Sequence, residues 1–153
     1  MKISSGRKDD VGVCLHIAAS LSKYFTPEAL EAIRNDLAGN EFHVARDDAG
    51  LPVGFVLIKR TSELTAELAW LAVDAAHHRH GVGTALVDAC CASLRTRGVR
   101  LILVRTLAKS ACYPPYEVSR SFLEKLGFIH IDTIDPYPGW APGNPCALYA
   151  RPL

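Results

Sequence analysis

The sequence has no hydrophobic run long enough to cross a membrane, no excess of one charge sign and no familiar cysteine pattern. A membrane-spanning helix needs about 20 apolar residues, and the opening MKISSGRKDD has no apolar leader. We therefore expect a soluble, cytoplasmic protein. Lys and Arg number 17 against 16 Asp and Glu, a balance that disfavours a nucleic-acid-binding protein. Any bound anion must be held by a local feature.

The five cysteines are odd in number, and none forms a C-x-x-C pair. This pattern fits neither a disulfide framework nor a zinc ribbon, so we expect reduced thiols. Cys90 and Cys91 fall within a helical pattern and are predicted to be packing residues. With 153 residues and 49% hydrophobic content, the chain can bury one core, and we expect a single domain over residues 1–153.

Apolar periodicity and turn residues divide the chain into helices and strands. Their order predicts a mixed α/β sheet with helices on its faces. The expected helices cover 10–22, 26–39, 82–97 and 116–126, and the expected strands cover 41–46, 51–60, 65–73, 99–107, 128–134 and 146–151.

The segment HHRHGVGTAL lies between an expected strand and an expected helix. This order leaves the backbone N–H groups from Gly81 to Thr84 without internal partners at a helix N-terminus. Glycines at 81 and 83 lack the Cβ atoms that would hold an anion away, and the helix dipole favours negative charge there. The segment therefore predicts a phosphate site, with positive potential added by His78, Arg79 and His80.

Other readings of this segment are weaker. A P-loop needs G-x-x-x-x-G-K-[ST], and a dinucleotide-binding turn needs a third glycine where this chain has Leu86. A metal site formed by His77, His78 and His80 lacks a Cys or carboxylate at a recognised ligand spacing. A charged helix end without any ligand is the simplest remaining alternative.

The stretch WLAVDAAHHRHGVGTALVDA resembles the acetyl-CoA-binding motif [QR]-x-x-G-x-[GA] of the GNAT superfamily of N-acetyltransferases, and YEVSRSFLEKLGF resembles its C-terminal helix and strand motif. The resemblance implies a GNAT-type acyl-CoA N-acyltransferase fold of the α/β class. Its central sheet would be mixed, mostly antiparallel and splayed at the cofactor site, with helices on both faces.

The same resemblance implies acetyl-CoA as cofactor. It assigns the pantetheine arm to the main chain of Leu71, Ala72 and Val73. The loop expected to hold the pyrophosphate consists of His78, Arg79, His80, Gly81, Val82, Gly83 and Thr84. His78 stands where the family has Gln or Arg, and Arg79 is available to compensate for the lost charge.

For catalysis, the resemblance implies Glu67 as general base and the Leu71 N–H as donor to the acetyl carbonyl oxygen. Strand alternation predicts that Glu67 and Leu71 share a face. A solvated glutamate at a strand end is the alternative for Glu67.

The family's general-acid tyrosine is replaced by Leu123, so we expect Tyr116, or Tyr113, to take that role. Arg120 is either a coenzyme phosphate ligand or a helix-surface charge. Tyr137 and Trp140 form either an aromatic wall for the acceptor or the packing of a proline-rich loop.

The expected function is N-acetyl transfer from acetyl-CoA to a primary amine by direct transfer in a ternary complex, because no cysteine is placed as an acyl-carrying nucleophile. The alternative is a non-catalytic acyl-CoA-binding module. The acceptor is a small-molecule amine or a protein amine, with no nucleic acid or membrane partner expected. A homodimer is compatible with the sequence.

Overall fold

The computed structural model describes residues 1–153 and has at its centre a seven-stranded sheet with the strand order β1-β2-β3-β4-β5-β7-β6. All neighbouring strands pair antiparallel except β4 and β5, which pair parallel. The strands are β1 (Lys2–Ser5), β2 (Glu41–Arg46), β3 (Pro52–Arg60), β4 (Thr65–Val73), β5 (Leu101–Leu107), β6 (Ile129–Ile134) and β7 (Cys146–Pro152). The helices are α1 (Val11–Ser20), α2 (Pro27–Gly39), α3 (Val82–Thr96) and α4 (Pro115–Lys125).

These elements confirm the expected helices and strands, with one addition. Helix α2 begins as its sequence predicts, because Thr26 Oγ1 accepts a hydrogen bond from Ala29 N at 3.1 Å and Pro27 occupies the first turn. Strand β1 was not expected. It has only four residues, KISS, with one large apolar side chain, Ile3, and it forms by pairing with β2.

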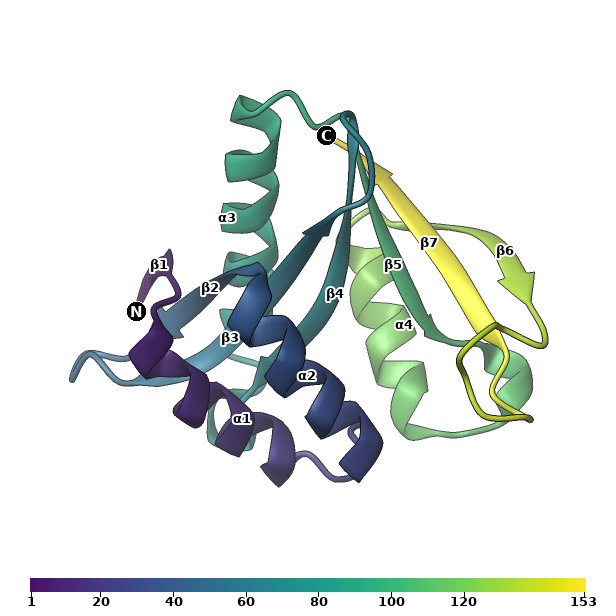
Figure 1. The fold of residues 1–153 in the computed structure, drawn as a ribbon, viewed down its shortest axis with the longest axis horizontal. Coiled ribbons are helices and arrows are strands. Elements are labelled where there is room, and N and C mark those ends of the chain that lie inside the picture. Colours follow the sequence, from purple (N-terminus) through teal and green to yellow (C-terminus); the bar gives the residue numbers. More distant parts are fainter.

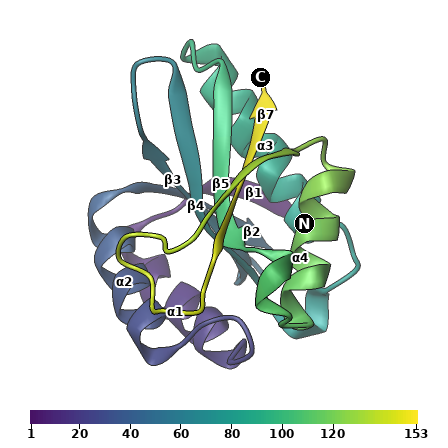
Figure 2. The ribbon, with the colours of Figure 1, turned by 90° about the vertical axis from the view of Figure 1, so that its right-hand side faces the viewer.

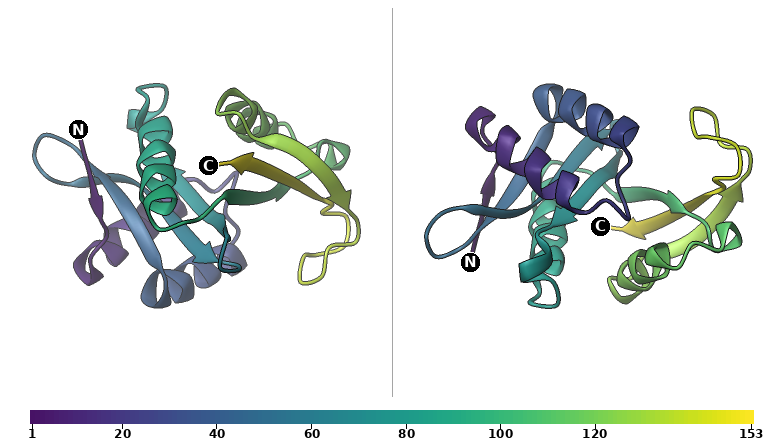
Figure 3. Two further views of the ribbon diagram at one scale, coloured as in Figure 1. Left: turned by 90° about the horizontal axis from the view of Figure 1, so that it is seen from above. Right: turned by 90° about the horizontal axis from the view of Figure 1, so that it is seen from below.

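The helices cover both faces of the sheet (Figures 1 and 3). Helices α1 and α2 lie on one face, and α3 and α4 lie on the other. Each side has its own core: one centres on Phe55 and Ile33, the other on Leu86 and Ile102. The segment between β6 and β7 projects on the face that carries α1 and α2 (Figures 2 and 3).

The central strands β4 and β5 stay together over only three residue pairs, the last of which is Glu67 with Leu103. Beyond that point the two strands diverge toward their C-terminal ends, and the sheet opens into a V (Figure 1). The splay expected from the family resemblance is therefore present.

Strand β4 also contains a bulge. Its pairing with β3 matches Trp70 with Leu57 and Leu68 with Ile58, which leaves Ala69 as an extra residue. A bulge of this kind shifts the side-chain alternation of the strand by one position. The faces of β4 before and after Ala69 are therefore exchanged.

The cysteines form no disulfide. Cys90 and Cys91 lie on α3 and are 0% and 2% exposed in the core, which confirms that they are packing residues. No helix is both long enough and apolar enough to span a membrane.

Candidate active site

The splay leaves main-chain groups of β4 without strand partners. Asp74 N donates to Val53 O of β3 at 2.9 Å, which fixes the alternation of the backbone groups along this part of β4. The main-chain N–H and C=O of Ala72 therefore point toward β3, where Ala72 is matched with Phe55. Those of Leu71 and Val73 point into the gap toward β5. Of the three residues expected to bind the pantetheine arm through their main chain, Ala72 is not available, because its main-chain groups are directed to β3.

At the open end of the gap lies the start of α3, preceded by a turn. Ala85 N donates to Gly81 O at 3.0 Å and begins the helix, whereas the N–H groups from Gly81 to Thr84 donate to no atom of the protein. Four orphan donors at the positive end of a 15-residue helix are suited to an anion. This part of the sequence-based site has the geometry that was predicted.

The two glycines of the turn are required for different structural reasons. Gly81 has φ of +78°, a conformation that side chains with a Cβ rarely adopt. A Cβ on Gly83 would lie 3.2 Å from Cζ of Phe122 on α4. The absence of a side chain at 83 thus lets α3 pack against α4, a role that sequence reasoning had given to ligand approach.

The basic residues of the turn point to different places. His78 Nε2 lies 2.6 Å from Val73 O, so the imidazole donates to a carbonyl of the gap and ties the turn to β4. His80 lines a separate hollow of about 270 Å³ that also contains His77 and the side chains of Asp47 and Asp48. Arg79 is exposed and forms no ion pair, which leaves it as the cation available to an anion.

No group of three or more His, Cys, Asp or Glu side chains is arranged to hold a metal ion. The histidines of this segment are used instead as a strand contact and as hollow-lining residues.

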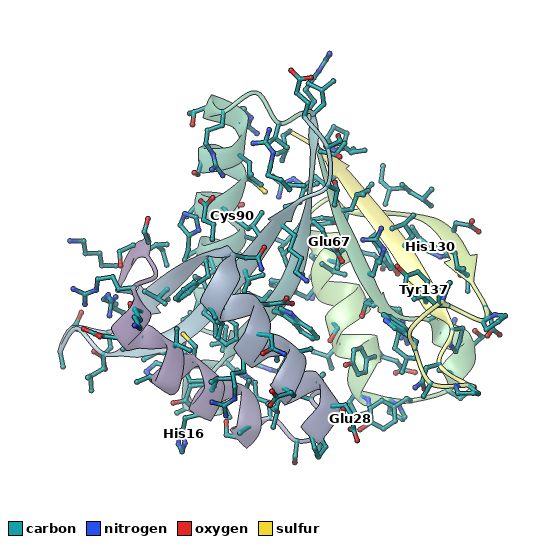
Figure 4. The ribbon with its side chains drawn as sticks, in the orientation of Figure 1. His16, Glu28, Glu67, Cys90, His130 and Tyr137 are labelled. Carbon is teal, nitrogen blue, oxygen red and sulfur yellow. The ribbon has the colours of Figure 1, made fainter.

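Glu67 lies at the point where β4 and β5 separate, on the face that carries α1 and α2 (Figure 4). Its Oε2 atom forms an ion pair with Nη1 of Arg105 at 2.8 Å. Leu71 packs instead against the core under α3 and α4. The prediction that Glu67 and Leu71 share a face is therefore wrong, because the bulge at Ala69 reverses the alternation between them.

Beside Glu67 lies a hollow of about 200 Å³, which we call the charged hollow. Asp36 on α2 accepts a hydrogen bond at Oδ2 from Trp70 Nε1 at 2.6 Å and forms an ion pair through the same atom with Lys59 Nζ at 2.8 Å. Trp70 packs against the core under α1 and α2 and also forms a wall of this hollow. Its lining comprises Asp36, Lys59, Glu67, Ala69, Trp70, Arg105, Tyr137 and Trp140.

Tyr137 and Trp140 come from the segment between β6 and β7, and their ring centroids are 5.1 Å apart. Their location in the charged hollow agrees with the expected aromatic wall; their role stays a prediction. Sequence reasoning missed Asp36, Lys59 and Arg105. A signal for Arg105 existed, because alternation in LILVRTL places it on the same face of β5 as Leu103, the partner of Glu67.

The hydroxyl groups of the two candidate acids, Tyr116 on α4 and Tyr113 just before it, both bond to the connection between α1 and α2. Tyr116 OH donates to Tyr24 O at 2.8 Å, and Tyr113 OH donates to Lys23 O at 2.7 Å. Burial, with smaller contributions from the neighbouring tyrosines, raises the pKa of Tyr116. The proton of Tyr116 is therefore engaged with the connection between α1 and α2.

The buried residues of α4 are Leu123 and Arg120. Leu123 is 4% exposed within the core. Arg120 is 8% exposed and donates from Nη1 to Leu107 O at the end of β5, at 2.8 Å. This burial rules out the expected alternative of a helix-surface charge for Arg120, and the contact holds α4 against the sheet. The other alternative, a coenzyme phosphate ligand, stays a prediction.

Comparisons with known proteins identify the family of this chain. The family model described as the acetyltransferase (GNAT) domain matches residues 38–130. The chain therefore belongs to the GNAT family of acetyltransferases, which confirms the resemblance, the fold and the class of acetyl-CoA-dependent enzymes. A comparison with curated protein sequences gives no significant match.

Solved structures share the whole fold at low sequence identity. A GNAT-family protein from Desulfovibrio desulfuricans superposes with a TM-score of 0.81 at 20% identity, covering 99% of each chain. The ribosomal-protein-S18-alanine N-acetyltransferase from Escherichia coli gives 0.76 at 21% identity, covering 99% of this chain and 92% of that one. An aminoglycoside 6′-N-acetyltransferase complexed with coenzyme A gives 0.72 at 20% identity, covering 99% and 97%. At these identities, the likeness establishes the fold alone.

Proposed function

We propose that this protein transfers the acetyl group of acetyl-CoA to a primary amine by direct transfer in a ternary complex. The proposal rests on one observation: the gap between β4 and β5 runs from main-chain groups of β4 to the free amides at the start of α3. Main-chain groups of Leu71 and Val73 that have no partner on β5 line one edge of the gap, and the free amides from Gly81 to Thr84 lie at its open end.

These groups fit the two polar parts of a coenzyme A molecule. An extended amide-containing arm can bond to the main chain of Leu71 and Val73, as an added strand would. A pyrophosphate can accept from the helix N-terminus, with Arg79 adding charge. Val73 O is already bonded to His78, so the Val73 N–H and the groups of Leu71 are the ones that remain for the arm.

Acetyl-CoA, when bound, supplies a thioester whose carbonyl carbon forms the new bond to the amine nitrogen while its bond to sulfur breaks. The Leu71 N–H, directed into the gap, is the proposed donor to the carbonyl oxygen, where negative charge develops. Glu67 is the proposed base for the amine proton. Four residues of strand separate Glu67 from Leu71, about 13 Å of extended chain, so Glu67 acts through a bridging water.

Departure of the sulfur has two proposed routes. A thiol of ordinary pKa, about 8.5, can leave as a thiolate and take its proton from solvent. In the second route Tyr116 supplies the proton, and to do so it must give up its hydrogen bond to Tyr24 O. The variants Tyr116→Phe and Tyr113→Phe distinguish these routes.

Calorimetry tests the cofactor site. Coenzyme A and pantetheine differ by the part that the α3 N-terminus would hold, and hydrogen bonds to charged groups contribute about 1.5–3 kcal/mol each. We expect coenzyme A to bind at least about 10-fold more tightly than pantetheine. Arg79→Gln should shrink this difference, and the control Arg95→Gln, at the other end of α3, should not. Equal affinity for the two ligands would contradict the assignment.

Thiol release from acetyl-CoA across a panel of primary amines tests the transfer. Direct transfer predicts thiol release only when an amine is present and no acetylated protein after incubation with acetyl-CoA alone. The second candidate, a non-catalytic acyl-CoA-binding module, is favoured by the engagement of both proton-handling groups, Glu67 with Arg105 and Tyr116 with Tyr24. Binding of coenzyme A without turnover on any amine would support it.

A further inference from the structure

The charged hollow contains two ion pairs that differ in how many contacts their polar atoms already make with the protein. Asp36 Oδ2 accepts a hydrogen bond from Trp70 and pairs with Lys59, so two partners fix this carboxylate and its charge is compensated. Glu67 and Arg105 touch through a single pair of atoms, Oε2 and Nη1. The Glu67–Arg105 pair therefore keeps more unused bonding capacity for a ligand than the Asp36–Lys59 pair.

Arg105 has the larger share of that capacity. A guanidinium group carries five N–H donors, and the contact of Arg105 with Glu67 engages only its Nη1 atom. Its side chain is 27% exposed, and that of Glu67 is 20% exposed, so both can meet a molecule in the hollow. A planar guanidinium fork is well matched to a carboxylate.

The charges of the hollow also select against some amines. Its two carboxylates, Asp36 and Glu67, are balanced by the two cations Lys59 and Arg105. A polycationic acceptor gains no net attraction from such a site, because each added positive charge meets a cation as well as a carboxylate. A zwitterion places one charge against each member of the Glu67–Arg105 pair.

We infer that the acceptor is a small free amino acid with an apolar or aromatic side chain, whose carboxylate binds to Arg105 and whose amine faces Glu67. This inference rests on the proposed N-acetyltransferase function. Trp70, Tyr137 and Trp140 provide the apolar wall for the side chain. The volume of about 200 Å³ is below the usual range for drug-sized ligands, and an internal or N-terminal residue of a peptide has no α-carboxylate to offer to Arg105.

A role in which Arg105 only orients Glu67 predicts something different. Loss of an orienting group lowers transfer to every amine by the same factor. Loss of a carboxylate-binding group lowers transfer only to acceptors that carry the carboxylate. The pair L-phenylalanine and 2-phenylethylamine, which differ by that group alone, separates the two roles.

The experiment measures kcat/KM for both acceptors with the wild-type protein, Arg105→Gln and Lys59→Gln. We expect the wild type to prefer L-phenylalanine by about 10- to 100-fold, the range of a charge-assisted hydrogen bond. Arg105→Gln should remove this preference. Lys59→Gln, which changes the other cation of the hollow, should alter both acceptors by a similar factor and keep the preference.

A second readout does not depend on turnover. Calorimetry follows 3-phenylpropanoate, which has the carboxylate and no amine, binding to the protein saturated with coenzyme A. We expect binding to the wild type and a loss of at least about 10-fold with Arg105→Gln. If this result holds while no amine is acetylated, the carboxylate site stands and the proposed transfer fails. Equal use of both acceptors by the wild type, or a preference that survives Arg105→Gln, overturns the inference.

Discussion

Glu67 and Leu71 lie on opposite faces of β4, although an uninterrupted strand would place them on the same one. This opposite placement determines the direction from which an amine could approach. Glu67 faces the side of α1, α2 and the segment between β6 and β7, whereas the Leu71 N–H lies in the plane of the sheet and points into the gap. An amine would therefore approach from the charged hollow toward a carbonyl held within the splayed sheet.

Glu67→Gln tests the base. If Glu67 accepts the amine proton through water, the variant should lose roughly 10²-fold in turnover at neutral pH. The loss should shrink as the pH rises, because the amine then deprotonates without help. Steady-state rates of thiol release between neutral and alkaline pH provide the measurement.

Glu63→Gln is the matched control, since Glu63 is an exposed residue of the connection between β3 and β4 and its side chain forms no ion pair. It should leave turnover unchanged. Calorimetry should give wild-type affinity for coenzyme A in both variants. Full turnover of Glu67→Gln across the pH range would return Glu67 to the role of a partner of Arg105.

Tyr116→Phe and Tyr113→Phe separate the two routes for the leaving sulfur. Each variant removes one hydrogen bond to a carbonyl of the α1–α2 connection, which should cost about 1 kcal/mol of unfolding free energy. If solvent protonates the thiolate, the two variants should have similar turnover. A loss confined to Tyr116→Phe, and larger than its loss of stability explains, would identify Tyr116 as the acid.

Much of the fold could be predicted because its signals are local. The stripe that includes Leu86, Val87 and Leu94 repeats at helical spacing, and α3 buries these residues as expected. The turn before α3 could be predicted for the same reason, since Gly81, the residue just before the helix, has a left-handed conformation that favours glycine. Orphan amides follow from the position of a helix start alone.

The features that sequence analysis missed depend on pairing between distant segments. The bulge at Ala69 exists because β3 and β4 are out of register by one residue, and nothing in ELAWLAV marks it. The contact of Arg105 with Glu67 follows from the parallel register of two strands. Likewise, burial of Leu123 and Arg120 results from how α4 docks on the sheet, and that docking was not specified by the motif.

Leu123→Tyr follows from this burial. A tyrosine at a position that is 4% exposed in the core must displace its neighbours, and overpacking of a core commonly costs 1–3 kcal/mol, so we expect a loss of about 2 kcal/mol. Urea unfolding measures it. A gain in turnover without a loss of stability would show instead that residue 123 faces the gap and can supply the missing acid.

Asp10 makes the stability depend on acid pH. Both oxygens of this 5% exposed carboxylate accept from Arg46, at 3.0 and 2.7 Å. The hydrogen bonds from Arg46, opposed by burial and aided by Arg7, lower the pKa of Asp10. The pair therefore stabilises the fold above the unfolded pKa of about 3.9 and ceases to do so as the pH falls through the lower folded pKa.

Asp10→Asn should remove that part of the acid dependence and, by leaving Arg46 without its partner, should cost about 3 kcal/mol at neutral pH. Urea unfolding at a series of pH values between neutral and strongly acid tests both effects. The neighbouring Asp9→Asn, which changes an exposed carboxylate, is the control and should cost little. Identical acid profiles for Asp10→Asn and the wild type would contradict the assignment.

The approach of α3 to α4 at Gly83 and Phe122 gives the last prediction, and it decides how variants of the turn should be interpreted. Because a Cβ at 83 would meet the Phe122 ring at 3.2 Å, Gly83→Val should lower the unfolding free energy by about 1–3 kcal/mol even without ligand. Gly12→Val in α1, where no atom lies within 4 Å of the added Cβ, should be nearly neutral. Phe122→Leu should relieve part of the strain, which a double-mutant cycle would register as a coupling of about 0.5–3 kcal/mol. Additive effects would mean that Gly83 serves ligand approach after all, and a loss of coenzyme A affinity in Gly83→Val would then report on the anion site itself.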